Sequence, residues 1–215
     1  MLRTLDLVLV KAFAEWAGRT LGAHKPRESD EERQMWTPAE VRRFGETATG
    51  VAHCPSSNAR LGAGIAPVAA LTAAGAPVGL GVDGAASNEA GELSGELRQA
   101  LLVARLNGGP QALTAREALA LGTIHGARCL GREAEIGSLE PGKLADVALW
   151  RLDDLDHAGI QDPVAALVLG PRPRVDHLLV GGKTVVEHGR LMTADEEIIA
   201  SELAAASRRI QEVAV

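Results

Sequence analysis

The sequence predicts an α/β fold, in which parallel strands alternate with helices, followed by a small β-rich part and a C-terminal helix. Two short apolar runs, residues 50–53 and 78–82, flank a helical run at residues 66–74, which is the order of a β-α-β unit. Each apolar run ends abruptly in polar and small residues. Because α/β folds place their chemistry at the carboxyl ends of parallel strands, we expect a functional site in these polar segments.

Helices are predicted on either side of this unit from their capping residues. Thr37 and Glu40 have the T-x-x-E spacing of a capping box, which predicts a helix from about residue 37 to 46. Further helices are expected at residues 93–106 and 115–130, and a second capping box opens the latter. These helices are expected to cover the sheet.

The character of the chain changes after residue 136. Short β-type runs at residues 145–150, 175–180 and 183–187 predict a separate antiparallel element, in which Gly181 and Gly182 form a tight hairpin turn. An amphipathic run at residues 194–213 predicts a final helix.

Composition narrows the classes of function. The chain has 215 residues, of which 46% are hydrophobic, so it can bury a sizeable core. Its formal net charge of −6, without a long basic run, and its 2% aromatic content disfavour nucleic-acid binding and attraction to anionic membranes. Apolar runs stay far below the roughly 20 residues of a membrane helix. A small molecule or a protein is therefore the expected partner.

The cysteines and the N-terminus indicate a compartment. Cys54 and Cys129 lie far apart without CxxC spacing, and the chain opens without the pattern of a secretory signal. We expect a cytoplasmic protein with free thiols. Cys54 lacks a catalytic partner pattern, so a small buried residue is the expected role rather than a nucleophile.

Four segments carry a resemblance to a known family. His-Cys-Pro-Ser-Ser-Asn at residues 53–58 and Gly-Val-Asp-Gly-Ala-Ala-Ser-Asn at residues 81–88 resemble the segments after the seventh and eighth barrel strands of the amidohydrolase superfamily. Residues 136–149 and 180–186 are similar to the entry and the closing hairpin of its C-terminal β-sandwich. The chain looks most like the branch of nucleobase deaminases and chlorohydrolases, and there most like the 8-oxoguanine deaminases.

The resemblance implies a fold and its boundaries. Residues 36–135 would form the C-terminal units of a TIM-like (β/α) barrel, as a partial barrel. Residues 136–215 would form a β-sandwich portion with a C-terminal helix, and residues 1–35 are left unassigned.

The resemblance also implies zinc chemistry. Members of the family hold a divalent metal, usually zinc, with His and Asp ligands, and the metal activates a water molecule for attack on an aromatic ring carbon. Asp83 matches a metal ligand that also acts in catalysis, and His53 matches a His at the mouth of the site. The alternatives are that Asp83 tightens a turn or caps a helix, and that His53 orients the Cys-Pro turn.

Substrate contacts are expected from polar residues after both strands. Alternatively, the serines and asparagines among them serve as turn and cap residues. The candidates are His53, Ser57, Asn58, Ser87 and Asn88.

Most of the metal ligands that the family uses are not recognisable. The missing motifs are a His-x-His pair, a His-x-x-Glu-like motif and a further His. His24 is either a displaced remnant or a surface His, whereas His125, His157, His177 and His188 are expected to be structural or exposed. Since stable zinc sites take three or four protein ligands, zinc binding by this chain alone is expected to be weak or absent.

Two hypotheses follow. The first is a zinc-dependent aminohydrolase for an oxidised purine, a triazine or a similar aromatic amine, represented by a partial chain. The second is a non-catalytic remnant or a subunit that pairs with another chain. Exposed strand edges of a partial barrel favour oligomerisation.

Overall fold

A computed structural model describes residues 36–213 of the chain. Its first strands, β1 (Val51–His53) and β2 (Val78–Leu80), pair in parallel, with His53 opposite Leu80. The predicted parallel pair is therefore confirmed. Between the strands lie α3 (Pro55–Leu61) and α4 (Val68–Ala73). The sequence predicted α4 but not α3, although Pro55 stands in the first turn, where proline is well suited.

The helices that carry capping boxes begin where expected. In α2 (Pro38–Glu46), Thr37 and Glu40 exchange both hydrogen bonds of the box, and Thr114 opens α6 (Ala115–Leu121) with Glu117 in the same way. The long helix α5 (Leu93–Gly108) also lies where it was predicted.

The helix predicted at residues 115–130 is wrong as a single element. After α6 the chain breaks at Thr123, whose backbone leaves the helical region (φ −129°, ψ −104°), and α7 (Ile124–Cys129) follows. The Thr123 hydroxyl donates to the Leu119 carbonyl oxygen at 2.8 Å, so the end of α6 is satisfied locally. The break lets α7 pack closely against β2. A Cβ atom on Gly79 would lie only 2.7 Å from the Cα of Gly126.

Two buried clusters hold this part together. The first contains Leu71 from α4 with Val51 and Val78 from the paired strands. The second contains Leu97 and Leu101 from α5, together with side chains from α6 and the later helix α8. Burial of these apolar groups fixes the strands against their helices, and thereby fixes the loops at the strand ends.

The C-terminal part contains the expected antiparallel sheet, with the strand order β3-β4-β5-β6. Its strands are β3 (Val147–Trp150), β4 (Val175–Val180), β5 (Lys183–Glu187) and β6 (Arg190–Leu191). Gly181 and Gly182 form the predicted turn between β4 and β5, and both have positive φ angles (56° and 77°). Such angles match the type of turn that suits twisted hairpins.

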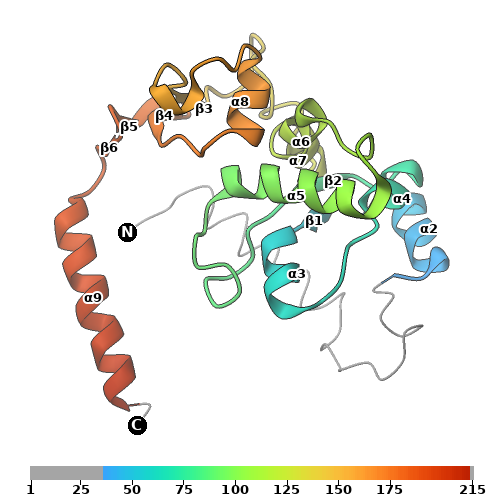
Figure 1. The fold of residues 1–215 in the computed structure, drawn as a ribbon, viewed down its shortest axis with the longest axis horizontal. Helices are drawn as coiled ribbons and strands as arrows, with labels where there is room; N and C mark the ends of the chain where they lie inside the picture. Colours follow the sequence, from blue (N-terminus) through green and yellow to red (C-terminus); the bar gives the residue numbers. More distant parts are fainter. Residues whose placement is uncertain (1–35, 214–215) are drawn as a thin grey trace.

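Between β3 and β4 the chain makes an excursion that the sequence did not predict. It forms the 3₁₀ turn η1 (Leu155–His157) and the helix α8 (Pro163–Leu169), which Asp162 caps. Because α8 packs against α5 and α6, the excursion returns to the first part of the chain (Figure 1).

The last helix, α9 (Glu196–Val213), extends away from the other elements (Figure 1). Large apolar side chains remain exposed along it, among them Leu203 and Ile210. Among the described helices, none is both long enough and apolar enough to cross a membrane. His24 and the rest of the unassigned segment lie outside the described residues.

Candidate functional site

The two strand ends meet through Ser57 and Asp83. Ser57 lies in α3, just after β1, and its hydroxyl donates to Oδ2 of Asp83 at 2.6 Å. Ser87 donates to the same oxygen at 3.0 Å. Because β1 and β2 are parallel neighbours, their carboxyl-terminal loops lie at one end of the sheet, as the sequence predicted.

Asp83 has an unusual backbone and an exposed carboxylate. Its φ angle is +63°, in the left-handed region that residues other than glycine rarely adopt. Burial would raise the pKa of its carboxyl, but hydrogen bonds from Ser57, the Gly84 backbone and Ser87 outweigh that effect and hold the pKa below its usual value. Asp83 therefore presents an ionised carboxylate at neutral pH. Strained residues of this kind are often found at functional sites.

A buried glutamate joins the two loops. Glu96, in the first turn of α5, accepts hydrogen bonds from the Asn88 side chain at 2.9 Å and from the Ser56 backbone amide at 3.0 Å. The Asn88 amide also donates to the Val82 carbonyl oxygen at 2.9 Å. Asn88 thus fits the loop-holding role that was the alternative to substrate contact.

Sequence reasoning did not select Glu96. An acidic residue in the first turn of a helix is usually an exposed partner of the helix dipole, and no local pattern separates Glu96 from that case. Only the tertiary fold makes it 2% exposed and brings two loops to it.

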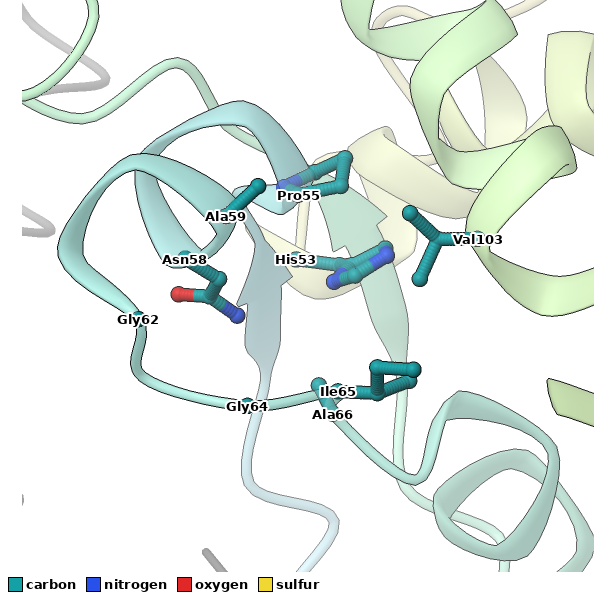
Figure 2. A pocket seen from close by; sticks show the side chains of 9 residues that line it. All are labelled: His53, Pro55, Asn58, Ala59, Gly62, Gly64, Ile65, Ala66 and Val103. Atoms are coloured by element: carbon teal, nitrogen blue, oxygen red, sulfur yellow. The ribbon is translucent and has the colours of Figure 1, made fainter. Parts of the chain in front are cut away.

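His53 faces a pocket of about 300 Å³ (Figure 2). Asn58 comes from α3, Val103 comes from α5, and residues 62–66 curve around the remaining side. The polar atoms of His53 and Asn58 thus face a lining that is otherwise mainly apolar. This is the usual character of a small-molecule site.

Burial controls the state of His53. Its side chain is among the buried polar groups, and Nδ1 has no hydrogen-bond partner within the described part of the chain. Desolvation lowers its pKa to about 4, so the imidazole is neutral at pH 7. A buried nitrogen without a partner is costly unless another molecule supplies one.

The environment of Cys54 disfavours the thiolate form. Burial, followed by the nearby charges of Asp83 and Glu96, raises its pKa to about 12, so the thiol stays protonated. Its expected role as a small, largely buried residue fits this environment.

The described residues do not by themselves fit a complete zinc centre at Asp83. Within residues 36–213, the group of three or more His, Cys, Asp and Glu side chains close enough to hold a metal does not include Asp83. Since a zinc site normally needs three or four protein ligands, Asp83 supplies one of them at most.

Comparison with known proteins identifies the family. The model of the amidohydrolase family matches residues 20–185, so the chain belongs to that family. It is 49% identical to an 8-oxoguanine deaminase from Pseudomonas aeruginosa over 172 residues, which cover 80% of this chain and 38% of that protein. It is 40% identical to a 5-methylthioadenosine/S-adenosylhomocysteine deaminase from Moorella thermoacetica, covering 78% of this chain and 40% of the relative.

Solved structures agree with this assignment. A zinc-bound adenosine deaminase from Xanthomonas campestris aligns with a TM-score of 0.78 and 30% identity, over 82% of this chain and 41% of that one. A zinc complex of atrazine chlorohydrolase from Arthrobacter aurescens aligns with a TM-score of 0.73 and 37% identity, over 79% of this chain and 38% of that one. The α/β fold is therefore that of amidohydrolases, and the chain spans about two fifths of the length of these relatives.

Proposed function

We propose that this chain supplies one part of a zinc-dependent aminohydrolase site that acts on an oxidised purine or a similar aromatic amine. The observation that carries the proposal is the placement of the Asp83 carboxylate and the His53 pocket at the ends of two adjacent parallel strands. The identity of 49% to an 8-oxoguanine deaminase favours 8-oxoguanine or a related purine over a triazine.

Asp83 is the proposed metal ligand and proton acceptor. Its lowered pKa keeps the carboxylate ionised, so it can take a proton from an attacking water molecule and pass it to the departing amino group. Ser57 and Ser87 hold Oδ2 in place and so act on substrate through Asp83. The other zinc ligands must come from outside residues 36–213, and zinc is the cofactor that the relatives suggest.

His53 and Asn58 are the proposed substrate contacts. A neutral imidazole can donate from one ring nitrogen and accept at the other, and an amide offers both kinds of group, so together they suit the alternating donors and acceptors of a purine edge. The substrate would thereby supply the partner that Nδ1 of His53 lacks.

The similarity to these relatives also supports an assignment of the two parts of the chain to the domains of the family fold. Residues 36–135 are assigned to the closing units of the (β/α) barrel, and residues 136–215 to the β-sandwich portion with its helix. The rival proposal, a non-catalytic remnant or a partner subunit, rests on Asp83 having no further metal ligands grouped with it among the described residues.

A chimera tests the proposal. Residues 36–215 are joined behind the preceding part of the Pseudomonas aeruginosa 8-oxoguanine deaminase, and ammonia release from 8-oxoguanine is followed with zinc present. We expect turnover in the chimera and none in this chain alone, because the chimera supplies the missing ligands. Asp83→Asn should abolish turnover, whereas Glu89→Gln, a change of an exposed neighbouring carboxylate, should not. A folded chimera that contains zinc but releases no ammonia would contradict the proposal.

A further inference from the structure

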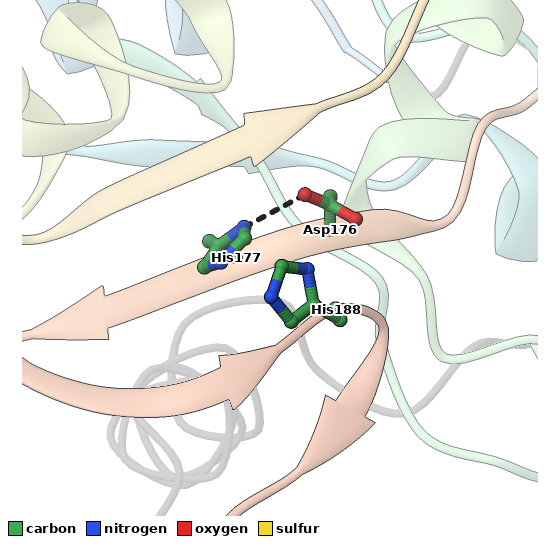
Figure 3. A group of neighbouring side chains, drawn as sticks. All are labelled: Asp176, His177 and His188. Atoms are coloured by element: carbon green, nitrogen blue, oxygen red, sulfur yellow. Dashed lines mark hydrogen bonds and ion pairs between the residues drawn. The ribbon is translucent and has the colours of Figure 1, made fainter.

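Three side chains at one end of the two central strands of the antiparallel sheet form a compact group of metal-binding type (Figure 3). Asp176 and His177 lie on β4, and His188 follows β5. One ligand atom from each lies within 4.8 Å of the others. The two imidazole rings are 4.7 Å apart between centroids and nearly perpendicular, at 76°.

The backbone holds this group in place. The hairpin brings β4 beside β5, with Leu178 opposite Val186, so His177 and His188 become neighbours although they are eleven positions apart. His188 has a φ angle of +49°, and the next amide, that of Gly189, donates to the Asp176 carbonyl oxygen at 2.9 Å. The turn that carries His188 is thereby fixed against β4.

The donor atoms of the three side chains are placed and exposed so that a metal ion can reach them. Nδ1 of His177 lies 2.7 Å from the Asp176 carboxylate, so these two donor atoms face one another, and a metal ion between them would take the place of the proton they share. The side chains of His177 and Asp176 are 28% and 23% exposed, and His188 is exposed, so a solvated ion can reach them.

We propose that Asp176, His177 and His188 bind a divalent transition metal of the zinc type, at a site separate from Asp83. Two imidazoles and a carboxylate are a donor set that zinc uses in open sites, where water takes the fourth position. Ligand atoms around tetrahedral zinc stand about 3.4 Å apart, whereas the donor atoms lie within 4.8 Å of one another and those of Asp176 and His177 are 2.7 Å apart. The group must therefore adjust slightly, and the exposed His188 ring can rotate to do so.

The bound metal ties β4 to the turn between β5 and β6. A metal that binds the folded chain but not the unfolded one stabilises the fold by an amount that grows with the logarithm of the free metal concentration relative to Kd. The site thus fastens the turn that leads into β6, the strand after which α9 begins. Weak or absent zinc binding was expected at Asp83, where most of the family's ligands are not recognisable. The site at Asp176, His177 and His188 uses none of those ligands.

Metal titration of the full chain tests the proposal. Zinc binding is measured by calorimetry, and cobalt binding by visible absorption, which reports coordination geometry. We expect one metal per chain with a tetrahedral or five-coordinate cobalt spectrum. His177→Ala and His188→Ala should each abolish that spectrum, and Asp176→Asn should weaken binding about 10- to 100-fold.

Two control variants separate this site from others. His125→Ala removes a histidine that lies in α7, and Asp83→Asn removes the carboxylate of the proposed aminohydrolase site. Both should leave the metal affinity and the cobalt spectrum unchanged. Unchanged metal binding in His177→Ala and His188→Ala, or no cobalt spectrum in the folded wild type, would overturn the proposal. Loss of zinc binding in Asp83→Asn would show that the wild-type chain binds the metal at Asp83, and would also overturn the proposal. Circular dichroism spectra confirm that each variant is folded.

Discussion

Ser57 and Asp83 are 26 positions apart in the chain, yet the hydroxyl of the first lies 2.6 Å from a carboxylate oxygen of the second. This hydrogen bond joins the end of β1 to the end of β2 and helps keep the carboxylate ionised. It therefore links the packing of the two strands to the acidity of the residue proposed to act in catalysis.

Removal of the Ser57 hydroxyl should raise the pKa of Asp83. In Ser57→Ala the carboxylate loses the hydrogen bond that lowers its pKa most, while the opposing effect of burial remains. The pKa is measured from the ¹³C shift of the Asp83 carboxyl group during a pH titration. Ser56→Ala is the matched control, because the hydrogen bond that Ser56 makes to Glu96 uses its backbone amide. An equal pKa in Ser57→Ala and the wild type would show that Ser57 does not tune Asp83.

Acid should destabilise the chain through His53. Its pKa of about 4 in the folded chain lies below the usual histidine pKa of about 6.5, so the unfolded chain binds the proton more readily. Stability from this group is complete above pH 6.5 and is lost as the pH falls toward 4, by about 3 kcal/mol in all.

Urea unfolding of the wild type and His53→Gln between pH 7.5 and 4 gives the free energy of unfolding of each protein as a function of pH. The difference between the two slopes against pH measures the effect of His53. The comparison removes the contribution of His157, whose pKa is raised by Asp154 and the Pro171 carbonyl and which therefore acts in the opposite direction. Parallel curves for the two proteins would mean that His53 does not titrate differently on folding.

Glu96→Ala should destabilise the fold by about 2–4 kcal/mol, because it leaves one N–H of the buried Asn88 amide and the backbone amide of Ser56 without an acceptor. Chemical denaturation measures the change. Glu89→Ala is the control, since its ion pair with Arg60 is exposed and should contribute at most about 1 kcal/mol. Similar losses in both variants would refute the special role of Glu96.

Gly79→Ala should destabilise the chain by about 1–3 kcal/mol, because the added Cβ would approach the Cα of Gly126 to 2.7 Å and force β2 away from α7. Gly84→Ala provides the contrast, since a Cβ there meets nothing within 4 Å. Thermal unfolding of both variants checks the prediction, and a neutral Gly79→Ala would show that α7 can shift at little cost.

Much of the fold could be predicted because its signals are local. Apolar runs bounded by polar residues marked β1 and β2, and the capping boxes at Thr37 and Thr114 marked the starts of two helices. The break at Thr123 could not be predicted in this way, because it goes with the close packing of α7 against β2, a contact between segments distant in sequence.

The residues of the candidate sites also fall into those that local sequence signals could predict and those that they could not. Asp83, His53 and Asn58 follow strands, so the strand pattern together with the family resemblance selected them. Glu96 and the Asp176, His177 and His188 group escaped notice because each depends on contacts between segments distant in sequence. The hairpin at Gly181 and Gly182 was the available signal for the pairing of the last two histidines.

Helix α8, which follows β3 in the chain, packs on helices α5 and α6 of the first part. Val168 of this helix is buried together with Leu97 and Ala118, and Arg98 donates to the Leu169 carbonyl oxygen at 2.7 Å. A protein cut anywhere between α7 and β3 would therefore be held together by a shared hydrophobic interface. The two pieces, produced separately, should each expose that interface and gain their structure only on recombination, as complementing halves of one cooperative unit.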